Sequence, residues 1–383
     1  SRFRPRRRTV GFAVVLTTIA ALIAYDFVAA PEELITQLKW DPTQMDWLIL
    51  TSIAVFGRYV ALPLAVNRRR TIRYGRELLS RPAGVLSLGA IVFLVTVALV
   101  GPDLFYSGYP RLMDRFQPPA FASLDTSSLT LAYECAGEMS GEVCHGSMKY
   151  LFGTTRIGED ITLLLAQGIR VALILGFAAG MIMAIVATVV GTVAGYYGGL
   201  VDDILTRYVE LQQTVPALVG FVVFATIFLG EYSSVTEGGL FSLALVFGLL
   251  DWGGIARLVR SEVFTRRSSG YVRAAKAAGA SDFHVIRRHI IPNSTATIVT
   301  AVTRRIPLLV LAHTALAYLE IHRAGARSLG RLLRIGLAGT HLPWHKKWWV
   351  TTFAVVALIL ITVSFNVFGD VIRDVIDPQS EVE

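Results

Sequence analysis

Long apolar runs separated by short polar segments dominate this chain. A helix needs about 20 mostly apolar residues to cross a bilayer. Runs of this kind occur at Val10–Ala30, Trp47–Val66, Gly84–Gly101, Val171–Gly195, Val215–Gly230, Gly238–Ala256, Thr295–Leu319 and Trp348–Phe368. The pattern therefore predicts an all-α, polytopic membrane protein with about eight transmembrane helices. The first run is long and has Asp26 at its exit, which favours a retained helix over a cleaved signal peptide.

Composition agrees with this pattern. The 383 residues are 54% hydrophobic and only 17% charged, with a mean hydropathy of +0.56. A soluble domain of this length needs a more polar surface. The net charge of +8 comes from Lys and Arg in short clusters between the apolar runs, not along one face of a domain. The charge therefore indicates membrane topology, and no nucleic-acid partner is expected.

The basic clusters predict the orientation of the chain, because Lys and Arg in short loops stay on the cytoplasmic side. The segments "SRFRPRRR" and "NRRRTIRYGRELLSR" flank the first two runs, so both ends of this hairpin are expected inside. Counting onward puts 102–150 outside, 257–293 inside and both termini in the cytoplasm. Parity places Glu320–Lys347 outside, although it carries Arg323, Arg327, Arg331, Arg334, Lys346 and Lys347.

Signatures of catalysis are absent from the sequence. It contains no G-x-x-x-x-G-K-[ST] phosphate loop, no H-E-x-x-H, no G-x-S-x-G and no G-x-G-x-x-G after a strand. Asp202 and Asp203 are neighbours that would project about 100° apart on a helix, so they make a poor acid/base pair. They are predicted to be solvated at a helix start. We expect no enzyme activity, no cofactor and no metal site in this chain.

The two cysteines, Cys135 and Cys144, both lie in the predicted outer loop. An oxidising compartment permits a disulfide between them, and closing so short a loop stabilises by roughly 2–3 kcal/mol. Two unrelated thiols are the alternative. A zinc site has less support, because only His145 stands nearby and a structural site needs four ligands.

The segment "GYVRAAKAAGASDFHVIRRHIIPN" is polar between two apolar runs. Strong helix formers lead to Gly279, which suits a left-handed helix end, and Ser281 with Asp282 can cap a second helix. Pro292 is predicted to stop that helix. Small residues give one face room for close approach of another backbone: Ala274, Ala275, Ala278 and Ala280. The residues alone leave open a docking helix or an ordinary basic loop.

This segment resembles the coupling-loop signature of prokaryotic ABC-importer permeases, E-A-A-x3-G-x9-I-x-L-P. The matching positions are Ala274, Ala275, Gly279, Ile291 and Pro292, whereas Arg273 replaces the Glu and His289 takes the first aliphatic position. Four further stretches resemble the dipeptide/oligopeptide/nickel permeases, C-type subunit, in order: "FGTTRIGEDI", "AGYYGGLVDDILTR", "DWGGIARLVRSEV" and "FNVFGDVIRDVIDP". Together the blocks span about Pro82 to Pro378.

The resemblance implies a permease subunit that imports di- or oligopeptides, with oligosaccharides or nickel as alternatives. It implies a B-type permease, two ATP-binding subunits that hold ATP and Mg, and an extracytoplasmic binding protein as partners. The implied ATPase-coupling residues are Tyr271, Ala274, Ala275, Gly279, Ala280, Ser281 and Phe283. The implied anchors of the loop are Arg257, Arg260, His289, Ile291 and Pro292.

Polar residues inside the run Thr295–Leu319 are candidates for the translocation pathway. Arg304, Arg305 and His313 lie there, where a charge costs at least a few kcal/mol and usually faces a cavity or a partner. A contact with a partner subunit, or snorkelling of the arginines, is the alternative. Adjacent arginines cannot both face a narrow pore, and Pro307 predicts a kink. An ion-coupled secondary transporter would need an inverted repeat and acidic residues in spans, which we do not find.

The predicted division of the chain has three parts. Residues 1–81 form an N-terminal extension with the additional hairpin, and 82–378 form the six-helix permease domain, including the outer loop 102–150 and the coupling loop 257–293. Residues 379–383 are a tail. The hairpin is left with three possible roles: packing against the core, binding lipid, or binding the partner permease.

Overall fold

The computed structural model describes residues 4–29, 42–106, 108–127, 134–228, 239–321, 327–338 and 343–376. The tail 379–383 lies outside them. The N-terminal half contains α1 (Arg4–Ala29), α2 (Gln44–Phe56), the π-helical η1 (Gly57–Ala61), α3 (Leu62–Val66), α4 (Arg68–Ser80), α5 (Pro82–Leu104), β1 (Ser123–Asp125), β2 (Met139–Ser140), β3 (Val143–His145) and α6 (Ile161–Tyr197).

The remainder of the described chain is helical. It contains α7 (Gly199–Thr214), α8 (Ala217–Phe228), α9 (Leu240–Leu250), α10 (Gly253–Arg267), α11 (Gly270–Ala277), α12 (Asp282–Val285), the π-helical η5 (Ile286–Ile290), α13 (Ile291–Tyr318), α14 (Leu329–Leu337) and α15 (Trp348–Ile376). Short 3-10 turns lie at η2 (Leu112–Asp114), η3 (Met148–Tyr150) and η7 (Trp344–Lys347).

Six helices of the described chain are long and apolar enough to cross a membrane, and up to eight if each of two bent pairs counts as one span. This confirms the predicted all-α polytopic class. The bent pairs are α7 with α8, at 74°, and α9 with α10, at 44°. The stretch Gly199–Thr214, in which a helix start was predicted at Asp202 and Asp203, forms helix α7. The run predicted at Gly238–Ala256 is broken at Asp251 and Trp252, between α9 and α10.

Proline 292 does not stop a helix, contrary to the prediction. It lies in the first turn of α13, directly after the π-helical η5, and this irregular turn accommodates a residue that lacks an N–H. The helical path consequently runs from Asp282 through η5 to Tyr318 without interruption. Pro307 is accommodated inside the same helix.

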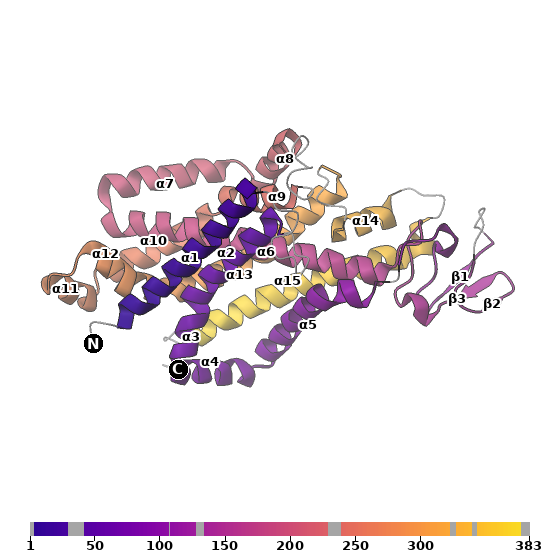
Figure 1. Ribbon diagram of the computed structural model, residues 1–383, viewed down its shortest axis with the longest axis horizontal. Coiled ribbons are helices and arrows are strands. Elements are labelled where there is room, and N and C mark those ends of the chain that lie inside the picture. Colours follow the sequence, from indigo (N-terminus) through magenta and orange to yellow (C-terminus); the bar gives the residue numbers. More distant parts are fainter. Residues whose placement is uncertain are drawn as a thin grey trace.

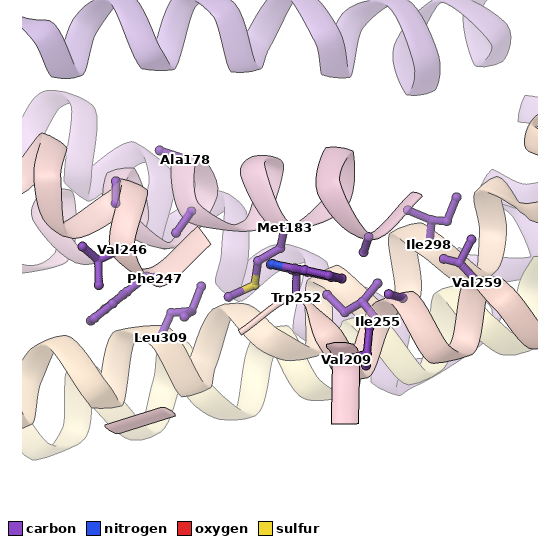
Figure 2. Packing of buried hydrophobic residues seen from close by; sticks show 14 of the residues in the cluster. Ala178, Met183, Val209, Val246, Phe247, Trp252, Ile255, Val259, Ile298 and Leu309 are labelled. Carbon is purple, nitrogen blue, oxygen red and sulfur yellow. The ribbon is translucent and has the colours of Figure 1, made fainter. Parts of the chain in front are cut away.

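The core sits where α6 packs against α9, α10 and α13. Met183, Phe247, Trp252 and Leu309 are buried between these helices (Figure 2). Gly191 of α6 lets the two backbones approach, since a Cβ there would lie 2.6 Å from the carbonyl oxygen of Ala256. Small residues in such an interface allow helices to pack closely in a membrane. A second cluster joins α5, α6, α14 and α15.

The additional hairpin packs against this core. Met45 and Trp47 of α2 are buried, and Met45 belongs to the cluster around α6 and α9. The Trp47 indole Nε1 donates to Asp26 Oδ2 of α1 at 2.9 Å, which ties the two helices of the hairpin together. Of the three roles that the sequence left open for the hairpin, packing against the core is therefore observed.

The two ends of the molecule differ in character. Figure 1 shows α11, α12, α4, the start of α1 and the end of α15 towards one end of the long axis, and the three strands at the other. The strands form an antiparallel sheet of order β1-β3-β2, with Leu124 opposite Cys144 and Met139 also opposite Cys144. The coupling segment and the outer loop thus lie at opposite ends, as the topology predicts.

The basic segment Glu320–Lys347 is neutralised by local partners. Arg331 pairs with Glu159 at 3.0 Å and Arg334 pairs with Glu320. Lys347 is buried, and its Nζ donates to the carbonyl oxygens of Ile335 and Ala338 at 3.1 and 3.2 Å. Arg323 lies outside the described residues.

Candidate functional site: the coupling helices and the vestibule

The break between α11 and α12 is built by Gly279. Its φ of +82° is a left-handed conformation that a side chain would oppose. The Gly279 N–H donates to Lys276 O at 2.9 Å, and the Ala280 N–H donates to Ala275 O at 3.0 Å. This pair of bonds is the Schellman ending of a helix. The Ser281 hydroxyl then accepts the His284 N–H at 3.3 Å and starts α12, as predicted.

The two short helices are amphipathic across the break. Val272 and Val285 are fully buried and fasten the pair to the core. The exposed residues include Tyr271, Ala274, Gly279, Ser281 and Phe283, of which Phe283 keeps 69% of its surface. A large apolar side chain left this exposed is typical of a protein contact site.

Two of the alanines do not contribute to the exposed face. Ala275 and Ala280 are half-buried and pack against the core cluster, contrary to the prediction that they form part of the small docking face. Ala275 lies three residues after the buried Val272, on the same face of α11, whereas Ala280 directly follows the break at Gly279. Ala274 and Ala278 are the small residues that remain accessible there.

A polar network joins the coupling helices to the end of α6. The Tyr196 hydroxyl donates to Asp282 Oδ1 at 2.5 Å, and the Lys276 Nζ lies 3.3 Å from the same oxygen. Lys276 also lies 4.8 Å from the centre of the Tyr196 ring. The Tyr196 hydroxyl and the Asp282 carboxylate raise the pKa of Lys276 above its ordinary value. Sequence reasoning missed this network, whose only signal was the "YYGG" of a matching block.

The predicted anchor Arg260 has a specific partner. Its Nη2 donates to Asp202 Oδ2 at 2.5 Å, and its Nε donates to Asp202 Oδ1. Asp202 is buried, so the prediction of a solvated helix start is wrong for it, although Asp203 is exposed. A two-bond arginine–carboxylate contact holds both partners in a fixed geometry. Arg260 thereby fastens α10 to α7.

The other predicted anchors lie around the same end. Arg257 donates from Nη2 to Gln213 Oε1 at the end of α7. His289 is half-buried, with its ring centroid 6.2 Å from those of Tyr271 and His284. Ile291 and Pro292 belong to the first turn of α13 and line a large open cavity.

This cavity, which we call the vestibule, has a volume of about 2050 Å³ and is lined by α3, α4, α10, α13 and α15. Both Arg304 and Arg305 line it, and which of the two faces a translocation pathway stays a prediction. The opening is a broad vestibule and not a narrow pore, which leaves room for both. Arg304 lies 3.7 Å from Asp370 and Arg305 lies 3.4 Å from Asp251. His313 is 1% exposed and does not line the vestibule.

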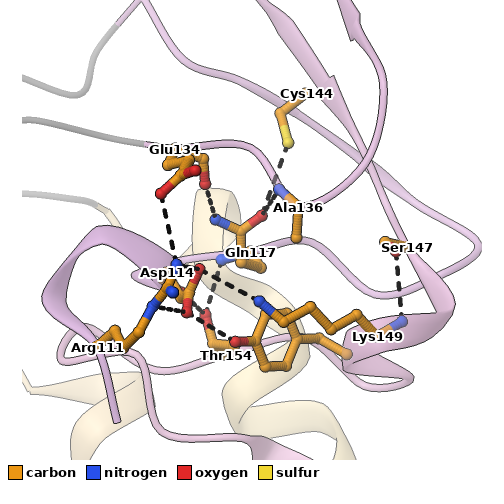
Figure 3. A network of polar contacts seen from close by, with 10 residues as sticks. Arg111, Asp114, Gln117, Glu134, Ala136, Cys144, Ser147, Lys149 and Thr154 are labelled. Atoms are coloured by element: carbon orange, nitrogen blue, oxygen red, sulfur yellow. Dashed lines mark hydrogen bonds and ion pairs between the residues drawn. The ribbon is translucent and has the colours of Figure 1, made fainter.

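The outer loop forms a compact module around a buried carboxylate (Figure 3). Asp114 accepts from Arg111 Nε at 3.0 Å and from the Tyr150 hydroxyl at 2.9 Å, and its backbone carbonyl accepts from Thr154 Oγ1 at 2.6 Å. Burial, and then Asp114, raise the pKa of Tyr150 above its ordinary range. Cys135 and Cys144 are joined by a disulfide in the same module. Among the described residues, no three His, Cys, Asp or Glu side chains are placed to hold a metal.

Comparisons with known proteins agree with this architecture. The dipeptide transport system permease protein DppC of Bacillus subtilis is 31% identical over 79% of this chain and 84% of its own length. The oligopeptide transport system permease protein OppC of the same organism is 30% identical over 61% of this chain and 73% of its own. The methionine ABC transporter MetNI, in an inward-facing conformation, aligns with a TM-score of 0.45 and 19% identity over 57% of this chain and 98% of that chain.

Residues 187–382, which include the coupling helices, α13 and α15, match the family described as the binding-protein-dependent transport system inner membrane component. This match covers α10, the coupling helices, α13 and α15. The chain therefore belongs to the family of inner-membrane permeases that serve binding-protein-dependent ABC importers.

Proposed function

We propose that this permease translocates di- or oligopeptides as one of two paired membrane subunits. The second, B-type permease, two ATP-binding subunits and an extracytoplasmic binding protein would complete the complex. We choose peptides as the substrate because the DppC and OppC relatives are permeases of dipeptide and oligopeptide transport systems. ATP and Mg would be held by the ATP-binding subunits, and this chain would carry out no catalysis and bind no cofactor.

The observation that carries this proposal is the pair of coupling helices. They present an exposed face with Ala274 and Phe283, and they are fixed to the core by Val272 and Val285. A docking subunit that moves this face moves α12 and, through η5, the continuous helix α13. Arg304 and Arg305 of α13 line the vestibule, so the motion would reach the residues proposed for the pathway.

The charge of the vestibule favours peptides over a bare metal cation. Nine of its lining residues are arginines, whereas two, Glu77 and Glu262, are acidic. A cavity lined by one sign of charge attracts ligands of the opposite sign. The terminal carboxylate of a peptide complements such a surface, whereas Ni²⁺ does not, and a neutral oligosaccharide gains nothing from the charge.

The outer module is the surface we propose for the binding protein, and the end with α11 and both termini would face the cytoplasm. The module is held together by the disulfide and the Asp114 network, so it offers a fixed shape for docking. This orientation follows the basic clusters of the sequence.

The test is reconstitution of the full complex in proteoliposomes with the cognate binding protein. We expect a tripeptide to stimulate ATP hydrolysis and uptake, and an oligosaccharide or Ni²⁺ to have no effect. Stimulation by Ni²⁺ or an oligosaccharide alone would contradict the peptide assignment. Uptake that requires an ion gradient and no ATP would contradict the importer.

A matched pair of variants tests the coupling face. Ala274→Trp places a bulky side chain on the exposed face, and we expect uptake to fall at least about tenfold because the docking subunit can no longer approach closely. Ser80→Trp, at the exposed end of α4, adds the same bulk at the same end of the molecule and should leave uptake unchanged. Equal uptake by both variants would contradict docking at α11.

A further inference from the structure

Helix α4 carries a dense positive charge on its accessible surface. Five of its 13 residues are arginines, and none of its side chains is buried. It follows the spanning segment Gln44–Val66 directly and precedes the spanning helix α5. Its position at the membrane boundary, beside the vestibule, brings its arginines to the level of lipid headgroups.

The arginines of α4 divide into two sets. Arg69, Arg70 and Arg73 line the vestibule, whereas Arg68 and Arg76 do not. In the part of the chain that the structure describes, neither Arg69 nor Arg70 has an acidic partner, unlike Arg304 and Arg305 on the opposite wall. Two adjacent guanidinium groups that face a cavity without counter-charges repel each other, and an anion placed between them would relieve that repulsion.

The vestibule also offers apolar surface beside these charges. Leu64 of α3 and Leu308 and Leu311 of α13 line it and remain 38%, 51% and 41% exposed. The volume of about 2050 Å³ exceeds the roughly 300–1,000 Å³ typical of small-molecule sites. A ligand that matches both features has an anionic head and long apolar chains.

We infer that Arg69 and Arg70 bind the headgroup phosphate of an anionic phospholipid, whose acyl chains lie against Leu64 of α3. Basic pockets between membrane helices on the cytoplasmic side are suited to anionic headgroups. This site gives the N-terminal extension a ligand of its own in addition to its packing against α6. The inference does not depend on which substrate the complex transports, because its first readout is lipid binding.

The experiment uses the full complex, purified in a neutral detergent and stripped of lipid. Binding of phosphatidylglycerol and of phosphatidylcholine is titrated separately by native mass spectrometry. We expect phosphatidylglycerol to bind at least about tenfold more tightly. Arg69→Gln/Arg70→Gln should weaken phosphatidylglycerol binding about 25-fold, because each arginine contributes about fivefold to the affinity. The same variant should leave phosphatidylcholine binding unchanged.

The matched control is Arg68→Gln/Arg76→Gln, which removes the same charge from the same helix outside the vestibule. It should retain the preference for phosphatidylglycerol. Equal binding of the two lipids by the wild type, or equal loss in both double variants, would overturn the inference. A competition with inorganic phosphate completes the experiment. Displacement of phosphatidylglycerol by millimolar phosphate would show a site for a soluble anion and would also overturn the inference.

Discussion

At the scale of single residues, the coupling end is held by contacts between neighbours in the sequence and by contacts between distant residues. Gly279 and Ser281 act through their own backbone neighbours, and both have the predicted conformations. Asp202 was expected in solvent, because its partner Arg260 lies 58 residues away and no local pattern connects them. Tyr196 and Asp282 are separated by 86 residues and escaped prediction for the same reason.

Tyr196 allows a test of the link between the coupling helices and α6. Tyr196→Phe removes the hydroxyl that donates to Asp282 but keeps the ring beneath Lys276. We expect the attachment to weaken by about 1 kcal/mol, the net value of one hydrogen bond. In reconstituted complex, peptide uptake per ATP hydrolysed should fall a few-fold while ATP hydrolysis continues.

The control for this change is its neighbour. Tyr197 is 55% exposed, and its hydroxyl has no hydrogen-bond partner among the described residues. Tyr197→Phe should therefore keep the wild-type ratio of uptake to hydrolysis. A ratio unaffected in Tyr196→Phe would show that this hydroxyl does not contribute to coupling.

At the scale of elements, hydrophobic runs predicted most spanning helices, whereas the positions of helix breaks were harder to predict from the sequence. Pro292 was expected to end a helix, since proline removes a donor, but the irregular turn directly after η5 accommodates a residue that lacks an N–H. The polar segment Gly199–Thr214 lacks an apolar run, so the sequence predicted its helix start at Asp202 and Asp203 but not its bent pairing with α8. Its packing on α10, through Asp202 and Arg260, is a tertiary contact that stabilises it.

The outer module allows a prediction at this scale. Its disulfide closes a loop with a sequence separation of nine around β2 and β3. Replacing both cysteines, Cys135→Ser/Cys144→Ser, should lower the free energy of unfolding of the module by roughly 2–3 kcal/mol, because the unfolded loop gains freedom. Trypsin added to the outside of intact vesicles should then cleave at the exposed Arg111 and Lys149 at least about tenfold faster.

Reduction supplies the matched control for this variant. A reductant should accelerate cleavage of the wild type to the rate of the double serine variant, and should leave that variant unchanged. Equal cleavage of oxidised wild type and double variant would mean that the Asp114 network alone sets the stability of the module.

At the scale of the whole molecule, the arrangement along the long axis connects charge with topology. The coupling helices, α4, the start of α1 and the end of α15 lie towards one end and the disulfide module at the other (Figure 1). Under the proposed orientation, the segment Glu320–Lys347 is an exception to the charge rule, and its partners would account for it. Arg331 pairs with Glu159 next to the start of α6, and the buried Lys347 is held by carbonyl oxygens. Charges paired in this way contribute less to retention of a loop in the cytoplasm.

Thiol labelling tests this topology, because both native cysteines are consumed by the disulfide. The wild type should therefore react with no membrane-impermeant maleimide, and each new cysteine reports on its own position. In intact cells we expect labelling of Tyr109→Cys, beside the outer module, and of Leu337→Cys, half-exposed on α14. Arg273→Cys on α11 and Arg76→Cys on α4 should react only after permeabilisation.

Leu337→Cys is the decisive position among the four. Gly330 of the same helix approaches the carbonyl oxygen of Thr314, near the end of α13 that lies away from the coupling helices, so α14 belongs to the half of the molecule that holds the strands. Its arginines would draw it inside if they were unpaired. Labelling of Leu337→Cys from outside would show that ion pairing with Glu159 and Glu320 overrides the loop charge. Labelling only after permeabilisation would place α14 in the cytoplasm and contradict the orientation proposed for α13.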